Sequence, residues 1–122
     1  MGMEIETRLS EQLSRYLDLA TTQVKLTAAN MANIDTPGYR AVGMDFEAEM
    51  QEAMAGVDRG VGSRPVRLKA LDGLISRPDG NNVSMDREGL NLAEAQLKFK
   101  IGVTLLRQEY QRVTDAIHAD GK

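Results

Sequence analysis

The side chains of this sequence that could do chemistry are few, and their types exclude most enzyme mechanisms. The 122 residues contain no cysteine and a single histidine, His118. A thiolate nucleophile, a disulfide and a zinc or iron–sulfur centre held by cysteine are therefore excluded. His118 lies near the end of the chain with no acid, base or nucleophile at a spacing that would make a catalytic pair. We expect a protein that is not an enzyme and that carries no cofactor.

Two acidic groups suggest cation binding, but a structural explanation is better for both. Four carboxylates alternate with Phe46, Met50 and Met54 in a segment whose spacing predicts a short helix over residues 45–54. These carboxylates are expected to form a solvated face and show no EF-hand spacing: Asp45, Glu47, Glu49 and Glu52. The run Asp79-Gly80-Asn81-Asn82 suits a turn at the entry to a helix. We expect no metal site in either segment.

The charge balance and the apolar pattern exclude further classes. Lysine and arginine number 15 against 18 aspartate and glutamate, a net charge of −3. A nucleic-acid partner is not expected, since such proteins carry a basic excess. No apolar run approaches the roughly 20 residues that span a bilayer, and the sequence begins with no pattern typical of a cleaved signal peptide. No small-molecule substrate is indicated.

Glycine and proline divide the chain into three parts of one expected domain, residues 1–122. All three prolines and eight of the eleven glycines lie in residues 37–89. Because these residues interrupt helices, the sequence predicts an N-terminal helix within residues 1–36 and a C-terminal helix within residues 84–122. Ser84 or Asp86 would cap the second helix. An irregular segment, residues 37–83, connects the two.

Both terminal segments repeat apolar residues at alternating spacings of three and four, which predicts a coiled-coil seam. The expected fold is therefore mainly α, with the two helices paired as an antiparallel hairpin. The predicted seam residues are Leu13, Leu17, Ala20, Val24, Met31, Phe99, Val103, Leu106, Tyr110 and Val113. A second apolar stripe lies beside the seam on the last helix: Leu90, Leu97, Ile101 and Leu105. One partner helix cannot cover both stripes, so we expect the second to meet a neighbouring subunit.

The middle segment contains a β-hairpin signal. Val66, Leu68 and Ala70 alternate with basic residues, and Asp72-Gly73 then precedes Leu74-Ile75. Asp-Gly suits a tight hairpin turn. The sequence therefore predicts a hairpin with its turn at residues 72–73.

Two motifs flank this middle segment. In the first, Pro37-Gly38 fits the central positions of a type II turn, and Asn33 could cap the preceding helix in the left-handed conformation. The first motif comprises Asn30, Asn33, Asp35, Thr36, Pro37, Gly38 and Tyr39. The second comprises Asp79, Gly80, Asn81, Asn82, Val83 and Asp86.

Residues 26–39 closely resemble the N-terminal signature of bacterial flagellar rod, hook and hook-associated proteins, and residues 79–99 resemble the C-terminal part of proximal-rod members. The resemblance implies a structural subunit of the flagellar basal body, located in the periplasmic rod. It also implies export through the flagellar type III apparatus without a cleaved signal. The implied partners are FlgC-type and further rod subunits, the adaptor FliE at the membrane-ring base, the export gate and other copies of the same chain.

Two questions stay open at this point. Exported rod and hook subunits share a Phe-x-x-x-hydrophobic signal, which Phe46 and Met50 match, but any amphipathic helix can produce this pattern by packing alone. The alternative to a rod subunit is a non-flagellar helical-hairpin adaptor that binds a partner helix. That alternative would use the same apolar stripes in a small, defined complex.

Overall fold

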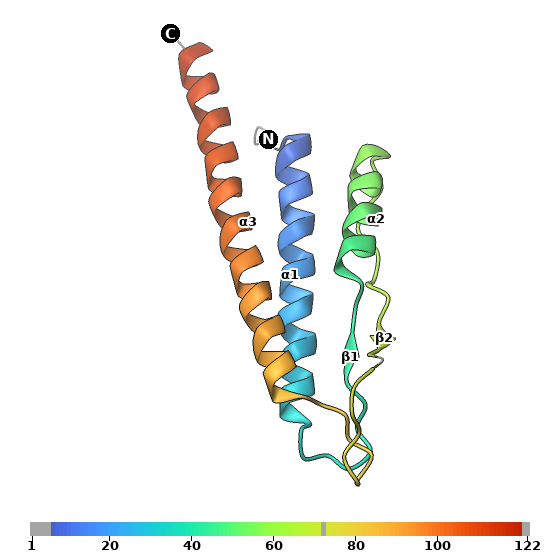
Figure 1. Cartoon of the computed structure of the whole chain (residues 1–122). Coiled ribbons are helices and arrows are strands. Elements are labelled where there is room, and N and C mark those ends of the chain that lie inside the picture. Colours follow the sequence, from blue (N-terminus) through green and yellow to red (C-terminus); the bar gives the residue numbers. More distant parts are fainter. Residues whose placement is uncertain (1–5, 72, 121–122) are drawn as a thin grey trace.

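Three helices and a short two-stranded sheet follow each other along the chain. The structure is a computed structural model that describes residues 6–71 and 73–120. The elements are α1 (Arg8–Ala32), β1 (Val42–Gly43), α2 (Phe46–Asp58), β2 (Lys69–Ala70) and α3 (Met85–Asp120). The molecule is elongated, and α1 lies between α3 on one side and α2 on the other (Figure 1). The predicted mainly-α fold with long terminal helices is confirmed.

Local signals set the ends of α1 and α3. Thr7 caps α1, because its Oγ1 accepts from the Ser10 N–H at 3.0 Å while Ser10 Oγ accepts from the Thr7 N–H at 2.8 Å. At the start of α3, the Ser84 hydroxyl accepts from the Arg87 N–H at 3.3 Å. Of the two expected caps Ser84 serves, and Asp86 lies in the first turn.

The face of α3 that packs on α1 is centred differently from the predicted seam. Its buried residues repeat every seven positions: Glu88, Ala95, Gly102 and Glu109. Phe99 and Tyr110, expected at the seam, are instead 43% and 42% exposed. The reason is the small size of Ala95 and Gly102, which lets α1 approach closely. A Cβ on Gly102 would lie 2.7 Å from Leu17 Cδ2.

The other predicted seam residues lie at or beside this contact. Leu13 and Ala20 are buried. The half-buried members are Leu17, Val24, Met31, Val103, Leu106 and Val113. The second stripe of α3 faces solvent in the single chain, with exposures of 61% for Leu90, 59% for Leu97, 45% for Ile101 and 43% for Leu105.

Helix α2 packs on α1 and is longer than predicted, since it continues to Asp58. Asp45 caps it by accepting from the Ala48 N–H at 3.1 Å. The Phe46 ring meets the Tyr16 ring edge-on, with centroids 5.8 Å apart. Lys98 Nζ of α3 lies 3.8 Å from the centroid of the Phe46 ring, a cation–π contact that links α3 to α2.

The predicted hairpin about residues 72–73 is wrong. Strand β2 pairs instead with β1, antiparallel, with Val42 opposite Ala70 and Gly43 opposite Lys69. After α2 the chain returns beside residues 41–43, whose backbone groups form hydrogen bonds with it. The Leu71 N–H, for example, donates to the Ala41 carbonyl at 3.0 Å. Leu74-Ile75 forms no strand, and Ile75 is 92% exposed, so no apolar face would be buried by pairing there. Asp72 lies outside the described residues.

Within residues 6–71 and 73–120, no helix is long and apolar enough to cross a membrane. In the same part of the chain, no three His, Asp or Glu side chains gather as metal ligands would. His118 is exposed near the end of α3.

Candidate functional site

The two sequence motifs meet at one end of the molecule, where α1 ends and α3 begins (Figure 1). Four polar side chains there are almost fully buried: Asn30 at 1%, Asn81 at 0%, Asn82 at 2% and Glu88 at 0% exposure. We call these four residues the polar cluster. Buried polar groups are costly unless they are hydrogen-bonded, so their partners decide whether this end of the fold is stable.

Both polar atoms of the Asn30 side chain form two hydrogen bonds each. Its Nδ2 donates to the Val42 carbonyl at 2.8 Å and to Glu88 Oε1 at 3.0 Å. Its Oδ1 accepts from the Val42 N–H at 3.0 Å and from the Tyr39 hydroxyl at 3.1 Å. A single residue of α1 therefore fixes the position of β1, of the first motif and of the first turn of α3.

Asn81 completes the end of α1 from far along the chain. Its Nδ2 lies within hydrogen-bond distance of three carbonyls, those of Asn33 at 2.8 Å, Ile34 at 3.0 Å and Thr36 at 2.8 Å. The last carbonyls of a helix have no partner within the helix. Arg77 also donates to the Ile34 carbonyl, and to that of Val83 at 2.8 Å. Asn81 and Arg77 thus hold the turn that follows α1, whereas the last carbonyls of the helix accept from the Asn33 and Ile34 N–H groups.

The predicted type II turn is present. Gly38 has a φ of +76°, and the Tyr39 N–H donates to the Thr36 carbonyl at 3.1 Å. The Gly38 N–H donates to the Asp79 carbonyl at 2.8 Å. A Cβ on Gly80, whose φ is +84°, would lie 3.4 Å from Gly38 Cα. The two motifs therefore touch backbone to backbone at a place where glycine is favoured.

Asn82 extends this contact along the first motif. Its N–H donates to the Tyr39 carbonyl at 3.2 Å, and its Oδ1 accepts from the Ala41 N–H at 2.6 Å. The neighbouring Val83 is buried at 3% exposure. Of the remaining motif residues, Asp35, Pro37 and Asp86 are exposed.

The expected left-handed conformation of Asn33 is wrong. Its φ is −104°, and its Nδ2 donates to the Ala29 carbonyl at 2.8 Å. Because the N–H groups of Asn33 and Ile34 already bond the last carbonyls of α1, no left-handed residue is required there.

A second polar group joins the opposite ends of the same helices. The Thr7 hydroxyl donates to Glu109 Oε2 at 2.6 Å, and Arg112 Nε and Nη2 donate to the two Glu109 oxygens, each at 2.9 Å. The hydrogen bonds from Arg112 and then Thr7 lower the pKa of Glu109 from its ordinary 4.5 to about 2. The sequence interpretation missed this contact, although Glu109 continues the seven-residue repeat that begins at Glu88.

The expectation of a solvated acidic face on α2 is confirmed for Asp45 and Glu47, which are exposed, and needs correction for Glu49 and Glu52. Glu49 is 6% exposed and pairs with Arg67 at 2.9 Å, and Glu52 pairs with Arg64 at 3.4 Å. Both arginines come from the segment that follows α2, so these two carboxylates contact that segment. The basic residues of this segment are the feature of the sequence that could have indicated these ion pairs.

These groups join separate segments of the chain. Within the described residues, the polar cluster bonds to other side chains and to backbone atoms. One atom stays without a partner there, the buried Oε2 of Glu88. The geometry defines a helical protein, in which two long helices are joined at two places by buried polar contacts and an apolar face of α3 is left uncovered.

Comparison with known proteins identifies the family. The chain is 32% identical to the flagellar basal body rod protein FlgB of Salmonella typhimurium, over 83% of this chain and 86% of the relative. It is 33% identical to FlgB of Proteus mirabilis, over 76% and 81%, and 29% identical to FlgB of Borrelia hermsii, over 84% and 90%. No family model matches the chain. At this similarity the chain belongs to the FlgB family of flagellar basal body rod proteins.

Proposed function

We propose that this chain is a structural subunit of the proximal rod of the flagellar basal body, with one rod-core domain built on α1 and α3. The observation that carries the proposal is the 32% identity to a flagellar rod protein over most of both chains. The polar cluster supports it, because the residues of both flagellar motifs contact one another there. In the part of the chain that the structure describes, no feature favours the helical-adaptor alternative over the rod.

The uncovered stripe of α3 supports assembly with neighbours. Leu90, Leu97, Ile101 and Leu105 are exposed on a helix whose buried residues, Glu88, Ala95, Gly102 and Glu109, form a different face. Burial of such a stripe against a different surface of the next subunit would build an open helical array. We assign to this surface contacts with other copies of the chain and with FlgC-type rod subunits. Contacts with the adaptor FliE at the membrane-ring base complete the proposal.

Export by the flagellar type III apparatus to the periplasm, without a cleaved signal, is the proposed route to the rod. In the folded chain Phe46 is half-buried between Tyr16 and Lys98. A signal at Phe46 and Met50 would therefore be read by the export gate before α2 packs on α1. This signal can be tested separately from the role in the rod.

The first experiment is mass spectrometry of detergent-purified basal bodies from the native organism. A rod subunit is expected at a few copies per particle in the wild type and at none in a deletion strain. Reintroduction of the gene should restore both the protein and swimming. Intact basal bodies that lack the chain would contradict the proposal and favour the adaptor alternative.

The export signal is tested by secretion. Phe46→Ala should lower the secreted amount several-fold if the export gate reads this residue. Tyr16→Ala is the matched control, because it removes the same ring contact and leaves the signal intact. Equal secretion of the two variants would show that Phe46 serves packing alone.

A further inference from the structure

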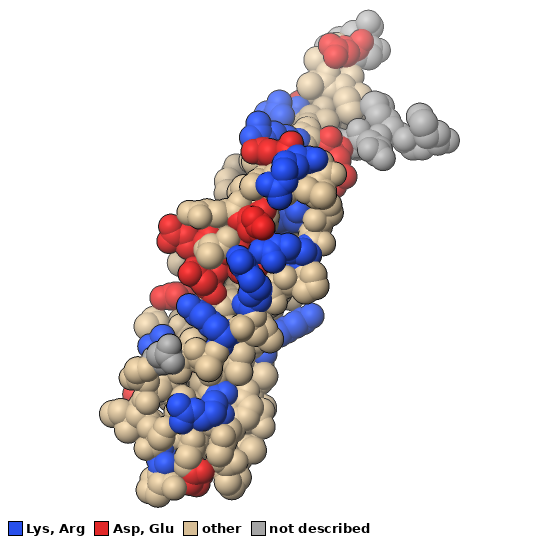
Figure 2. Space-filling model, turned by 90° about the vertical axis from the view of Figure 1, so that its right-hand side faces the viewer, with Lys and Arg blue, Asp and Glu red and all other residues tan. Residues whose placement is uncertain are grey.

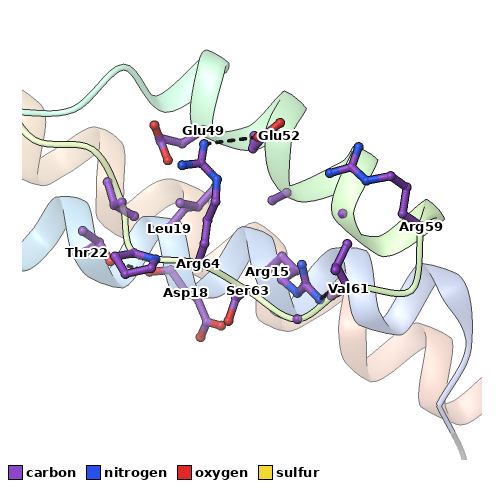
Figure 3. Close-up of a pocket in the computed structure, with 15 residues that line it drawn as sticks. Arg15, Asp18, Leu19, Thr22, Glu49, Glu52, Arg59, Val61, Ser63 and Arg64 are labelled. Carbon is purple, nitrogen blue, oxygen red and sulfur yellow. Dashed lines mark hydrogen bonds and ion pairs between the residues drawn. The ribbon is translucent and has the colours of Figure 1, made fainter.

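Residues 60–68, which we call the strap, run back over the groove between α1 and α2. Figure 3 shows that the side chains lining this groove come from both helices and from the strap. The groove encloses about 420 Å³ and includes Leu19 of α1 and Ala53 of α2. The strap therefore forms one wall of an open groove.

Backbone hydrogen bonds hold the strap only near its two ends. At one end the Val61 N–H donates to the Gly56 carbonyl at 2.9 Å, and beyond the other end β2 pairs with β1. Residues 62–68, all described, make no backbone hydrogen bond to another backbone group. Their side chains contribute little burial, since Leu68 is 58% exposed and only Val66 is half-buried. Apolar packing is therefore a weak restraint on the strap.

Charged groups supply the remaining contacts. Arg67 pairs with Glu49, Arg64 pairs with Glu52, and Arg15 Nη2 of α1 donates to the Val61 carbonyl at 2.7 Å. Figure 2 shows acidic and basic side chains gathered along the middle of this face. Glu49 is 6% exposed whereas Arg67 is 61% exposed, so one partner is buried and the other lies at the surface. Salt screens the exposed Arg64–Glu52 pair, and it weakens the Arg67–Glu49 pair to a smaller extent because Glu49 is buried.

The strap leaves α2 through a fixed cap: Gly60 has a φ of +69°, its N–H donates to the Val57 carbonyl at 3.1 Å, and the Val61 N–H donates to the Gly56 carbonyl. Gly62, beyond this cap, makes no hydrogen bond to another backbone group and has open space around it, so the strap can turn there. The α1–α3 contact lies on the other side of α1 (Figure 1). Opening of the strap therefore requires no change at that contact.

We propose that the strap is an electrostatic latch, which opens from the α1–α2 groove independently of the α1–α3 pair and which salt releases. The Arg67–Glu49 pair is the principal restraint, because opening leaves the Glu49 carboxylate without its partner. The latch is a property of the chain itself and does not depend on the proposed place in the rod.

The chain has no cysteine, so a single introduced thiol reports opening. Ala53→Cys places a half-buried thiol in the wall of the groove, and its rate of reaction with a thiol reagent measures how often the strap opens. We expect this rate to rise about threefold between 20 and 500 mM NaCl, because the ion pairs are screened over this range. Arg67→Gln should raise the low-salt rate about tenfold. Glu49→Gln with Arg67→Gln should abolish most of the salt dependence.

The control thiol is Ala95→Cys, because Ala95 is fully buried on the α3 face that packs on α1. Its rate should change neither with salt nor with Arg67→Gln. A parallel rise at residue 95 would show that opening is global and would overturn the proposal. A rate at residue 53 that is insensitive to salt and to Arg67→Gln, or that equals the rate of free cysteine throughout, would also overturn it. If circular dichroism shows that Ala53→Cys does not fold, Thr22→Cys in the α1 wall of the groove replaces it.

Discussion

Replacement of Asn30 by alanine tests the central claim about the polar cluster. The change removes four hydrogen bonds and leaves both oxygens of the buried Glu88 without a partner. At about 1 kcal/mol of net stabilisation for each bond, Asn30→Ala should lower the free energy of unfolding by about 4 kcal/mol. That is a large share of the roughly 5–15 kcal/mol by which small domains are stable.

The assay is urea denaturation of the purified chain, followed by circular dichroism of the helices. Asn33→Ala is the matched control, since Asn33 is also an asparagine at the end of α1 but is bonded only at the surface, to Ala29 and Thr36. Asn33→Ala should lower the free energy of unfolding by about 1 kcal/mol or less. Unfolding free energies of the two variants that agree within about 0.5 kcal/mol would refute the reasoning.

Three further predictions concern the helices. Gly102→Val should destabilise the chain by about 2 kcal/mol, because a Cβ there meets α1, whereas Gly89→Ala, with open space around it, should stabilise α3 by about 0.5–1 kcal/mol in the same denaturation assay. The folded-state pKa of Glu109 lies at about 2, below its ordinary 4.5, so its contribution is complete above pH 4.5 and is lost as the pH falls toward 2. In denaturation measured at several pH values, the stability difference between wild type and Glu109→Gln should therefore shrink over this range, and a difference that stays constant would contradict the assignment. Leu97→Asp should leave the unfolding free energy within about 0.5 kcal/mol and abolish swimming, and normal swimming would remove Leu97 from the subunit interface.

Local patterns were sufficient to predict the helices. The distribution of glycine and proline placed α1 and α3, and the capping residues near each start are short-range features. The type II turn also followed from Pro37 and Gly38 alone, because the backbone preferences of those two residues specify it.

The helix face was less predictable, because a heptad pattern marks where apolar residues recur and does not show how closely two helices approach. Gly102 and Ala95 form the closest contact because they are small, and this turns Phe99 toward solvent. Glu88 can be buried because Asn30, 58 residues away in sequence, donates a hydrogen bond to it. Glu109 can be buried because Thr7, 102 residues away, does the same. Contacts at such separations leave no mark in a local pattern.

The sheet shows the same limit. Asp72-Gly73 is a strong local turn signal, yet residues 69–70 pair with residues 42–43, beyond a whole helix. A pair of adjacent short strands has little stability of its own. Asn30 already holds Val42 in place through two hydrogen bonds. Residues 69–70 therefore form their backbone hydrogen bonds with a strand whose position is fixed.

The contact between Gly38 and Gly80 brings the start and the end of the segment between these glycines side by side, while α2 within that segment packs on α1. The free energy of closing such a loop grows only with the logarithm of its length, by about 0.6 kcal/mol for each doubling. A change in the length of the exposed loops between these glycines should therefore cost little free energy while the Gly38–Gly80 contact stays in place. The junction fixes where the connecting segment starts and ends, and the length of its exposed loops is free to vary.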